Sequence, residues 1–339
     1  MDSLTQIVLG AACGEIALGK KIGNKALLFG AIGGTIPDLD VFIGAWLYNN
    51  EIDAMAFHRG FMHSILFAFL GSFLFGWITY KLYNTGKRIE TTTQKDWVWL
   101  FFLSMFTHPI LDSFTPYGTQ LFAPFSDYRV AFNTISVADP AYTIPFLLCL
   151  IIMMFFNRKR TRRTWWLKAS MYISSAYLLF TVGNKFYIDS VFKKSFQNAG
   201  IEYHRFSAQP TILNNILWYG IAETETEYHA TFYSLFDKSA TVDTILTLQK
   251  NHDLLDMNTP DLKTLRWFSN DYYNLIKNKD DTYSYIDLRY PMMNANDKNS
   301  SVFKFTIIKK NNRWDILPFM GNPPSKEDFN AFIERVKGR

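Results

Sequence analysis

Cysteine is scarce in this sequence, and its scarcity narrows the folds and sites that are possible. The 339 residues include two cysteines, Cys13 and Cys149, and both lie inside apolar segments of the first half. We interpret them as small packing residues, not as a disulfide or a metal-binding pair. The second half has no cysteine and therefore fits either an oxidising or a reducing compartment.

The sequence also lacks a basic segment at its start, where residues 1–6 carry no Lys or Arg. A cleaved signal peptide needs such a segment, so we expect the first apolar stretch to remain in the mature protein. The net charge of +5 is modest, and no internal repeat or low-complexity segment is evident. Hydrophobic patterning is therefore the main guide to the fold.

Hydrophobic residues are abundant, at 48%, and aromatic residues make up 17%. They concentrate in the first half, where Phe61–Tyr83 exceeds the roughly 20 apolar residues that a membrane helix needs. Glycines four residues apart, such as Gly10 and Gly14, let membrane helices approach closely. We predict an α-helical polytopic membrane domain of about five helices over residues 1–185. The apolar runs are 4–19, 26–47, 61–83, 97–114, 140–156 and 165–182.

A basic run at 158–163 lies between the last two of these apolar runs. Such a run could bind nucleic acid, but its position beside two tryptophans favours a cytoplasmic anchor under the positive-inside rule. The basic clusters at 20–25 and 84–96 then fall on the same side. We therefore expect no nucleic-acid partner, and we expect the chain after Val182 to be extracytoplasmic.

Residues 186–339 are predicted to form a small soluble α+β domain. Pro260–Lys277 has Leu262 and Leu265 on one side, which is typical of an amphipathic helix, and Asn311-Asn312 is predicted as a turn. Segments rich in β-branched and aromatic residues indicate strands at 211–223, 227–236, 281–289 and 301–309, and further helices are expected at 184–197 and 326–337.

The residues best suited to catalysis or metal binding are histidines and carboxylates that lie beside apolar runs. His58 and His63 flank the start of the 61–83 run, and His108 and Asp112 are spaced to share one face of a helix. Ionisable groups at membrane depth are costly and normally mean function. Nitrogen and carboxylate ligands suit zinc and similar divalent ions. We predict a divalent metal site, with zinc first and manganese second, from six candidates: Asp38, Asp40, His58, His63, His108 and Asp112.

Two neighbours of these ligands are candidate catalytic residues. Arg59 suits a phosphate or carboxylate because its planar fork donates two parallel hydrogen bonds, although a headgroup-level anchor is an equal alternative. Ser64 could be a nucleophile, but no Gly-x-Ser-x-Gly turn surrounds it, which favours hydrogen bonding to a ligand or the backbone. The ligand candidates have their own structural alternative, as satisfied interior hydrogen-bonding groups.

These motifs together resemble the bacterial YdjM-type family of membrane-bound metal-dependent hydrolases. The resemblance covers roughly residues 1–160 and departs at Gln6, where some relatives have histidine, so Asp2 is the substitute ligand candidate there. The segment 209–218 looks like the C-terminal domain of a longer subgroup. The motifs are Asp2-x-x-Thr5-Gln6, Pro37-Asp38-Leu39-Asp40, His58-Arg59-Gly60-x-x-His63-Ser64, His108-x-x-x-Asp112 and Thr115-x-x-Gly118.

The resemblance implies a multi-pass protein of the bacterial inner membrane with metal-dependent hydrolase activity. We expect a metal-activated water to cleave a phosphoester or lipid-linked substrate, so the expected partners are membrane lipid and a small-molecule or lipid-linked substrate. The order of ligands is also similar to that of the zinc-dependent phospholipase C and P1 nuclease class. Some family members are described as linked to the DNA-damage repressor LexA, which makes a non-catalytic scaffold or stress-linked regulator the alternative. A transporter is a third interpretation, which the lack of an inverted repeat disfavours.

Overall fold

The computed structural model describes residues 1–242, 244–291, 301, 303–317 and 326–339. The chain divides into two compact units. The first comprises residues 1–43 and 57–182, and the second comprises 44–56 and 183–339. Residues 44–56 were predicted to belong to the membrane domain, whereas they form part of the second unit.

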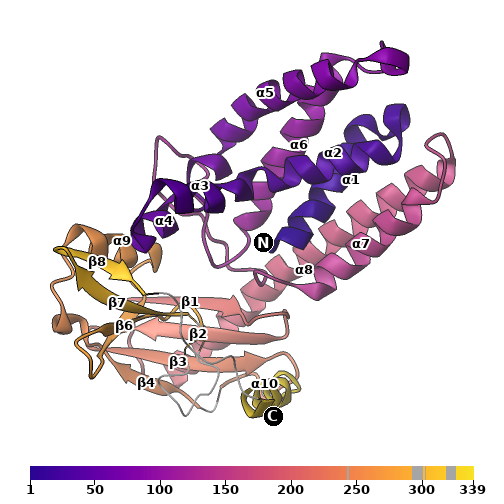
Figure 1. Ribbon diagram of the computed structural model, residues 1–339. Helices are drawn as coiled ribbons and strands as arrows, with labels where there is room; N and C mark the ends of the chain where they lie inside the picture. Colours follow the sequence, from indigo (N-terminus) through magenta and orange to yellow (C-terminus); the bar gives the residue numbers. More distant parts are fainter. Residues whose placement is uncertain (243, 292–300, 302, 318–325) are drawn as a thin grey trace. The chain divides into compact units, whose positions relative to one another are not determined.

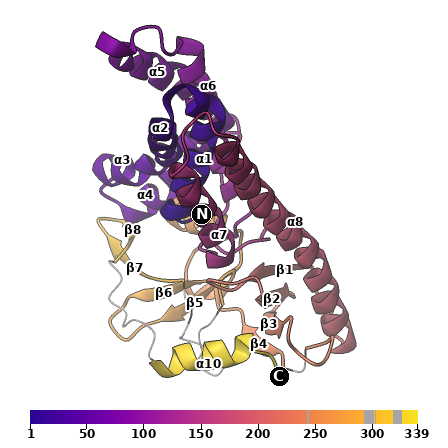
Figure 2. The same ribbon diagram turned by 90° about the vertical axis from the view of Figure 1, so that its right-hand side faces the viewer.

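The first unit consists of helices (Figures 1 and 2). Side-chain caps explain where several of them begin: Asp2, Ser64 and Asp139 each accept hydrogen bonds from the first turn, and Thr93 forms a capping box with Asp96. The helices are α1 (Ser3–Ile22), α2 (Asn24–Thr35), α3 (Asp40–Leu47), α5 (Ile65–Tyr83), α6 (Gln94–Asp112), α7 (Pro140–Met154) and α8 (Thr161–Asn198), with short 3-10 turns at η1 (Pro37–Leu39), η2 (Phe61–His63) and η3 (Gly86–Arg88). α3 and α8 continue from one unit into the other.

Glycines bring α1 and α2 into backbone contact, as their four-residue spacing predicts. A Cβ added at Gly10 would lie 2.8 Å from the Cα of Gly34, and one added at Gly14 would lie 2.9 Å from the Cα of Gly30. No side chain fits into this interface without moving a helix. The close approach matters for the site because Gly34 is the next-to-last residue of α2.

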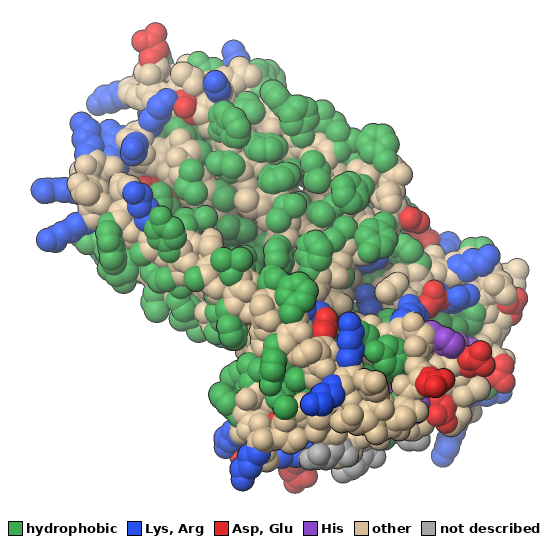
Figure 3. All heavy atoms as spheres, turned by 180° about the vertical axis from the view of Figure 1, so that it is seen from behind, with side chains coloured by type: hydrophobic (Ala, Val, Ile, Leu, Met, Phe, Trp, Pro, Cys, Tyr) green, Lys and Arg blue, Asp and Glu red, His purple; other side chains and the backbone are tan. Residues whose placement is uncertain are grey.

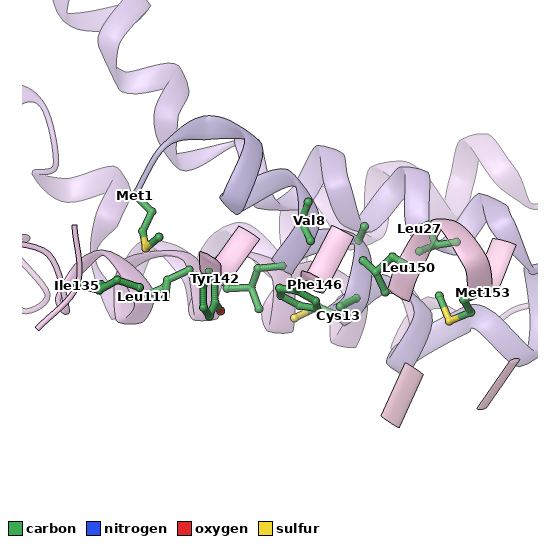
Figure 4. Close-up of a cluster of buried hydrophobic side chains, with 13 residues drawn as sticks. Met1, Val8, Cys13, Leu27, Leu111, Ile135, Tyr142, Phe146, Leu150 and Met153 are labelled. Atoms are coloured by element: carbon green, nitrogen blue, oxygen red, sulfur yellow. The ribbon is translucent and has the colours of Figure 1, made fainter. Parts of the chain in front are cut away.

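The core of the first unit lies where α1, α6 and α7 meet (Figure 4). Phe146 and Met153 on α7 are fully buried in one cluster with Val8 and Ala12 on α1. Cys13 belongs to the same cluster and Cys149 is buried beside it, and both are free thiols, in agreement with their interpretation as packing residues. This core joins α1 to α7, and Leu111 extends it to the end of α6.

The length and composition of the helices identify fewer membrane spans than the five expected. Within the described residues, α5 alone is long and apolar enough, and α2 with the segment Pro37–Leu47 is a second candidate if this pair, bent by 44°, counts as one span. α7 is apolar but shorter, with 15 residues. Figure 3 shows hydrophobic side chains spread over the surface of the helical unit. These features are compatible with a membrane protein, and the number of its spans stays a prediction.

The second unit contains two antiparallel four-stranded sheets with the strand orders β1-β2-β3-β4 and β5-β6-β7-β8. The end of α8 packs Phe192 and Phe196 on the first sheet, and α9 packs Leu262 and Leu265 on the second. A helix followed by a four-stranded meander therefore occurs twice. The bounds are β1 (Arg205–Pro210), β2 (Leu217–Glu223), β3 (Glu227–Ser234), β4 (Leu246–Gln249), η4 (His252–Leu254), α9 (Pro260–Phe268), β5 (Tyr273–Lys277), β6 (Tyr283–Asp287), β7 (Lys304–Lys310), β8 (Arg313–Ile316) and α10 (Lys326–Val336).

A short helix from the first half of the chain completes this unit. α4 (Glu51–Phe57) places Ile52 in the core of the second sheet, where it is fully buried. Asn50 donates a hydrogen bond of 2.8 Å to the carbonyl of Trp314, and Asp53 forms a bidentate ion pair with Arg313. The segment just before His58 is therefore anchored in the second unit.

Candidate metal centre

Five of the six predicted ligands lie close together near the ends of four chain segments: Asp38, Asp40, His63, His108 and Asp112. The sixth, His58, contacts Asp40. Asp38 lies on the 3-10 turn that separates α2 from α3, and Asp40 begins α3. Pro37 supplies the break because it lacks a backbone donor and fixes φ. His63 ends the turn before α5, whereas His108 and Asp112 occupy the last turn of α6.

Three ligand atoms converge on one point. The Nε2 atoms of His63 and His108 are 3.1 Å apart, and Asp38 Oδ1 lies 3.4 Å from each of them. Metal bonds of about 2.0–2.1 Å in tetrahedral geometry place ligand atoms about 3.3–3.4 Å apart. The triad Asp38, His63 and His108 therefore has the spacing of a small divalent cation's ligands. The Asp38 side chain keeps 23% of its surface exposed, whereas both histidines are buried.

The hydrogen-bond partner of Nδ1 in each histidine determines whether Nε2 of the same ring can accept a hydrogen bond or bind a metal. His108 Nδ1 lies 2.6 Å from the carbonyl oxygen of Gly34, which can only accept, so Nδ1 carries the proton. His63 Nδ1 lies 3.0 Å from Asp40 Oδ2, an acceptor when ionised. His108 Nε2 is then a lone-pair acceptor. His63 Nδ1 makes no aligned hydrogen bond within the described residues, and His63 Nε2 is an acceptor when the Nδ1 that faces Asp40 carries the proton. Such partners on the far nitrogen also orient histidines in metal sites.

Asp40 and His58 lie behind His63. Asp40 bridges the two rings, with Oδ1 2.8 Å from His58 Nδ1 and Oδ2 near His63. Its second oxygen also accepts a 2.9 Å hydrogen bond from the backbone N–H of Arg59. Both were predicted as ligands from the sequence. In the structure, Asp40 faces Nδ1 of His63, the nitrogen that points away from the triad, and His58 contacts the other carboxylate oxygen of Asp40. Neither belongs to the triad.

Asp112 lies beside the triad, and its two oxygens differ. Oδ1 accepts hydrogen bonds from Gln6 Nε2, at 2.8 Å, and from the α-amino group of Met1. Oδ2 lies 3.6 Å from each histidine Nε2 and 3.2 Å from Arg59 Nε, yet it accepts no aligned hydrogen bond from any described residue. A buried anionic oxygen without a donor is costly. A cation beside Oδ2 would remove that cost, so the described residues fit a divalent metal.

Arg59 is held in an unusual backbone conformation next to Asp112. Its φ is +57°, which for a residue with a side chain costs on the order of 1–3 kcal/mol. The backbone bond to Asp40 and a 3.1 Å bond from Gln120 N to its carbonyl hold it there. Its guanidinium lies 4.5 Å from the centre of the Tyr117 ring, and Nη1 donates to Thr115 Oγ1 at 3.2 Å. These contacts hold the Arg59 side chain beside Asp112 despite the backbone strain.

Ser64 is placed differently from the other candidates. Its hydroxyl is fully buried and accepts a 3.0 Å hydrogen bond from the N–H of Phe67, which makes it the N-cap of α5. That contact agrees with the backbone alternative and leaves the nucleophile interpretation without geometric support. Asp2 likewise caps α1, through a 3.0 Å bond from the N–H of Thr5.

Sequence reasoning missed three contributors to this site. The carbonyl of Gly34 orients His108, and a backbone atom leaves no signal in a single sequence. Gln6, which the resemblance marked as a departure, supports Asp112 and the carbonyl of His108 from α1. Tyr117 stacks against Arg59, and its place within the Thr115-x-x-Gly118 motif was the one available clue.

A helical unit with an apolar span and a buried cluster of histidines and carboxylates defines a membrane protein with a candidate metal centre. Residues 1–186 match the family of YdjM inner membrane proteins. The chain therefore belongs to that family, which confirms the resemblance drawn from the motifs. All the site residues lie within the matched region.

Two curated relatives are similar to part of the chain. The uncharacterized protein YfhP of Bacillus subtilis (strain 168) is 32% identical over 159 residues, which cover 45% of this chain and 46% of YfhP. The inner membrane protein YbcI of Escherichia coli (strain K12) is 34% identical over 145 residues, or 40% of this chain and 77% of YbcI. The matched part thus spans under half the length of YfhP. No solved structure matches the chain.

Proposed function

We propose that this protein is a membrane-bound metal-dependent hydrolase that cleaves a phosphoester or lipid-linked substrate. The observation that carries the proposal is the triad of acceptor atoms, His63 Nε2, His108 Nε2 and Asp38 Oδ1, separated by 3.1–3.4 Å. Three mutually facing acceptors repel one another unless a cation lies between them. Zinc is the first candidate for that cation and manganese the second.

Each residue around the triad has a separate task in this proposal. A divalent ion would act as a Lewis acid and activate water near neutral pH. Asp40, 3.0 Å from His63 Nδ1, and the carbonyl of Gly34, 2.6 Å from His108 Nδ1, would hold the two imidazoles with their Nε2 lone pairs inward. Asp112 Oδ2, which accepts no hydrogen bond within the described residues, would take the proton from the attacking water. As the ester bond broke, that proton would pass to the leaving oxygen.

Arg59 would hold the anionic group of the substrate. Its side chain is 5% exposed, Nη1 donates to Thr115, and Nε, although 3.2 Å from Asp112 Oδ2, makes no aligned hydrogen bond within the described residues. A guanidinium with a spare donor beside the metal ligands suits a phosphate oxygen. Substituting Arg59 with Lys would keep the charge and lose the fork.

The proposed membrane topology places the site at the outer face of a multi-pass bundle. Three basic segments meet at one end of the helical unit, as the blue side chains in Figure 3 illustrate. Lys21 pairs with Asp96 at 2.6 Å, and Arg158 contacts the carbonyl of Lys21. The positive-inside rule makes this end cytoplasmic. The triad lies toward the opposite ends of α1 and α6, so the site and the second unit would be extracytoplasmic.

The deciding experiment is elemental analysis of the detergent-purified protein. We expect close to one zinc or manganese per chain, lost in His63→Ala/His108→Ala and retained in His229→Ala/His252→Ala, whose histidines lie in the second unit. Hydrolysis of phosphoester and phospholipid substrates should disappear with the metal and return when the ion is restored to the wild-type protein. A folded, metal-supplied protein that binds no ion would end the proposal.

A non-catalytic scaffold or regulator is the alternative, and one feature favours it. The α-amino group of Met1 and the guanidinium of Arg59 already offset the charge of Asp112, and a proton shared between His63 and His108 would satisfy both rings. In that case the cluster is a polar core that holds α1, α5 and α6 together. The same double variant would then unfold more easily without any change in metal content.

A further inference from the structure

We infer that residues 119–132 form a loop that inserts into the lipid headgroup layer beside the metal centre, so that the site faces the bilayer. This loop follows α6 and precedes α7. Its backbone is ordered by hydrogen bonds: Thr119 and Val130 pair as an antiparallel bridge, and Phe132 N donates to Ser113 O at 2.7 Å. Because many of its backbone N–H groups are hydrogen-bonded to the protein, such a backbone can enter a region that is poor in water.

Most of the side chains that this loop presents outward are aromatic, with Pro124 and the charged Asp127 exposed between them. Phe125 is 83% exposed, and the others with more than half of their surface exposed are Phe122, Tyr128 and Phe132. Moving one such ring out of water is worth roughly 1.5–3 kcal/mol, so an exposed group of four marks a surface with an apolar partner. Aromatic side chains are enriched where a protein meets the membrane interface.

The attachment of the loop identifies the bilayer as that partner. Leu121 O accepts a 3.0 Å hydrogen bond from Ile65 N, and Ile65 is the first residue of α5, the helix with the length and composition of a span. Phe61, just before α5, is also exposed and packs edge-on against Phe67, with ring centroids 5.7 Å apart. The aromatic side chains therefore lie where α5 enters the membrane.

The same loop is tied to the candidate metal centre. Gln120 N donates to Arg59 O at 3.1 Å, and Tyr117, just ahead of the loop, stacks on the Arg59 guanidinium. Insertion of the loop would thus hold Arg59 at the depth of lipid phosphates. The substrate class, resting on the proposed function, is then an amphiphile whose phosphate reaches Arg59 while its acyl chains stay in the bilayer.

Spin labels on the full chain in phospholipid vesicles test the insertion. The buried Cys13 and Cys149 are replaced by Ala, and one label is placed at Phe125→Cys. Leu74→Cys, on the exposed face of α5, is the lipid control, and Phe236→Cys, 60% exposed in the second unit, is the aqueous control. Collisions with oxygen, which partitions into lipid, and with a water-soluble nickel chelate then report the depth of each label.

The label at Phe125 should collide more with oxygen than with nickel, as at Leu74, and Tyr128→Cys should repeat the result at a second position of the loop. Nickel collisions equal to those at Phe236 would overturn the inference, and so would a label shielded from both reagents, which would mean that protein covers the loop. Metal content is measured on the same samples. A lipid-embedded loop in a metal-free protein would refute the proposed hydrolase and leave the insertion standing.

Discussion

At the residue scale, the triad and its orienting partners should respond differently to substitution. Asp38→Asn removes a ligand charge, so we expect near-complete loss of bound metal. Asp40→Asn removes a charge from the far side of His63 and should weaken metal affinity by about 10–100-fold without abolishing it, the usual effect of an outer-shell partner. Competition with a chelator in detergent measures both affinities.

Asp281→Asn is a suitable control for this pair because its side chain is 97% exposed in the second unit. It should bind metal like the wild type. Equal losses for Asp38→Asn and Asp40→Asn would mean that Asp40 is itself a ligand, as the sequence first suggested. The distinction depends on the 3.0 Å contact of Asp40 with His63 Nδ1.

Gln6 makes a second prediction at this scale. Its amide donates to Asp112 Oδ1 and to the carbonyl of His108, and both acceptors are buried. Gln6→Met keeps the volume but removes the donors, so unfolding free energy should fall by about 1–3 kcal/mol. Thermal unfolding in detergent measures the change, with the exposed Gln94→Met as control. Equal melting temperatures for both variants would show that Gln6 is dispensable.

The sequence predicted which residues form the site more completely than it predicted how they are arranged. His108 and Asp112 were expected on one helical face, and the structure brings His108 Nε2 within 3.6 Å of Asp112 Oδ2. The i to i+4 spacing carries that information locally. No local pattern states that Asp40 contacts Nδ1 of His63 while Asp38 contacts Nε2, because that depends on how the break at Pro37 folds against α5 and α6.

At the scale of elements, the glycine contact between α1 and α2 links stability to the site. Gly14→Ala forces the helices apart and should cost about 1–3 kcal/mol. Gly34→Ala should do the same and also weaken metal binding, since Gly34 O orients His108. Gly183→Ala is the matched control: its Cβ would meet nothing within 4 Å, so the variant should gain up to about 1 kcal/mol.

Thermal unfolding and chelator competition separate these effects. Gly14→Ala should shift the melting temperature more than the metal affinity, and Gly34→Ala should change both. If Gly34→Ala bound metal as tightly as Gly14→Ala, the carbonyl of Gly34 would have no role in orienting His108. A stabilised Gly183→Ala variant would show that the losses at Gly14 and Gly34 do not come from a general sensitivity of the helices to substitution.

In the second unit, the hydrophobic periodicity of the sequence led to a wrong prediction. Pro260–Lys277 was predicted as one helix, but α9 ends at Phe268 and the rest forms β5. Asn270 and Asp271 adopt φ of +51° and +57°, a left-handed conformation that Asn and Asp tolerate and a helix does not. Asn311 and Asn312, by contrast, were predicted as a turn, and they join β7 to β8 with positive φ.

Ile52 tests the unexpected inclusion of α4 in the second unit. Its side chain is fully buried with Leu262, Tyr285 and Trp314. Ile52→Ala should cost about 2–5 kcal/mol because it leaves a cavity in that core. Protease susceptibility of the second unit measures the loss, with Ile212→Ala as control, since Ile212 is partly exposed on a turn between β1 and β2. Unchanged protection would mean that α4 is not anchored there.

At the scale of the whole molecule, α8 sets the expected location of the second unit. It begins at the basic run and has 38 residues, so it is about 57 Å long at 1.5 Å per residue, well beyond a hydrocarbon layer of about 30 Å. If α8 spans the membrane, as the proposed topology requires, and its basic start is cytoplasmic, its end emerges on the other side. Single cysteines in the Cys13→Ala/Cys149→Ala background test this: Asp281→Cys should react with an impermeant maleimide in intact spheroplasts, whereas Lys87→Cys should react only after permeabilisation. The reverse pattern would invert the protein in the membrane and move the metal centre to the cytoplasmic face, where the same chemistry would meet the inner leaflet.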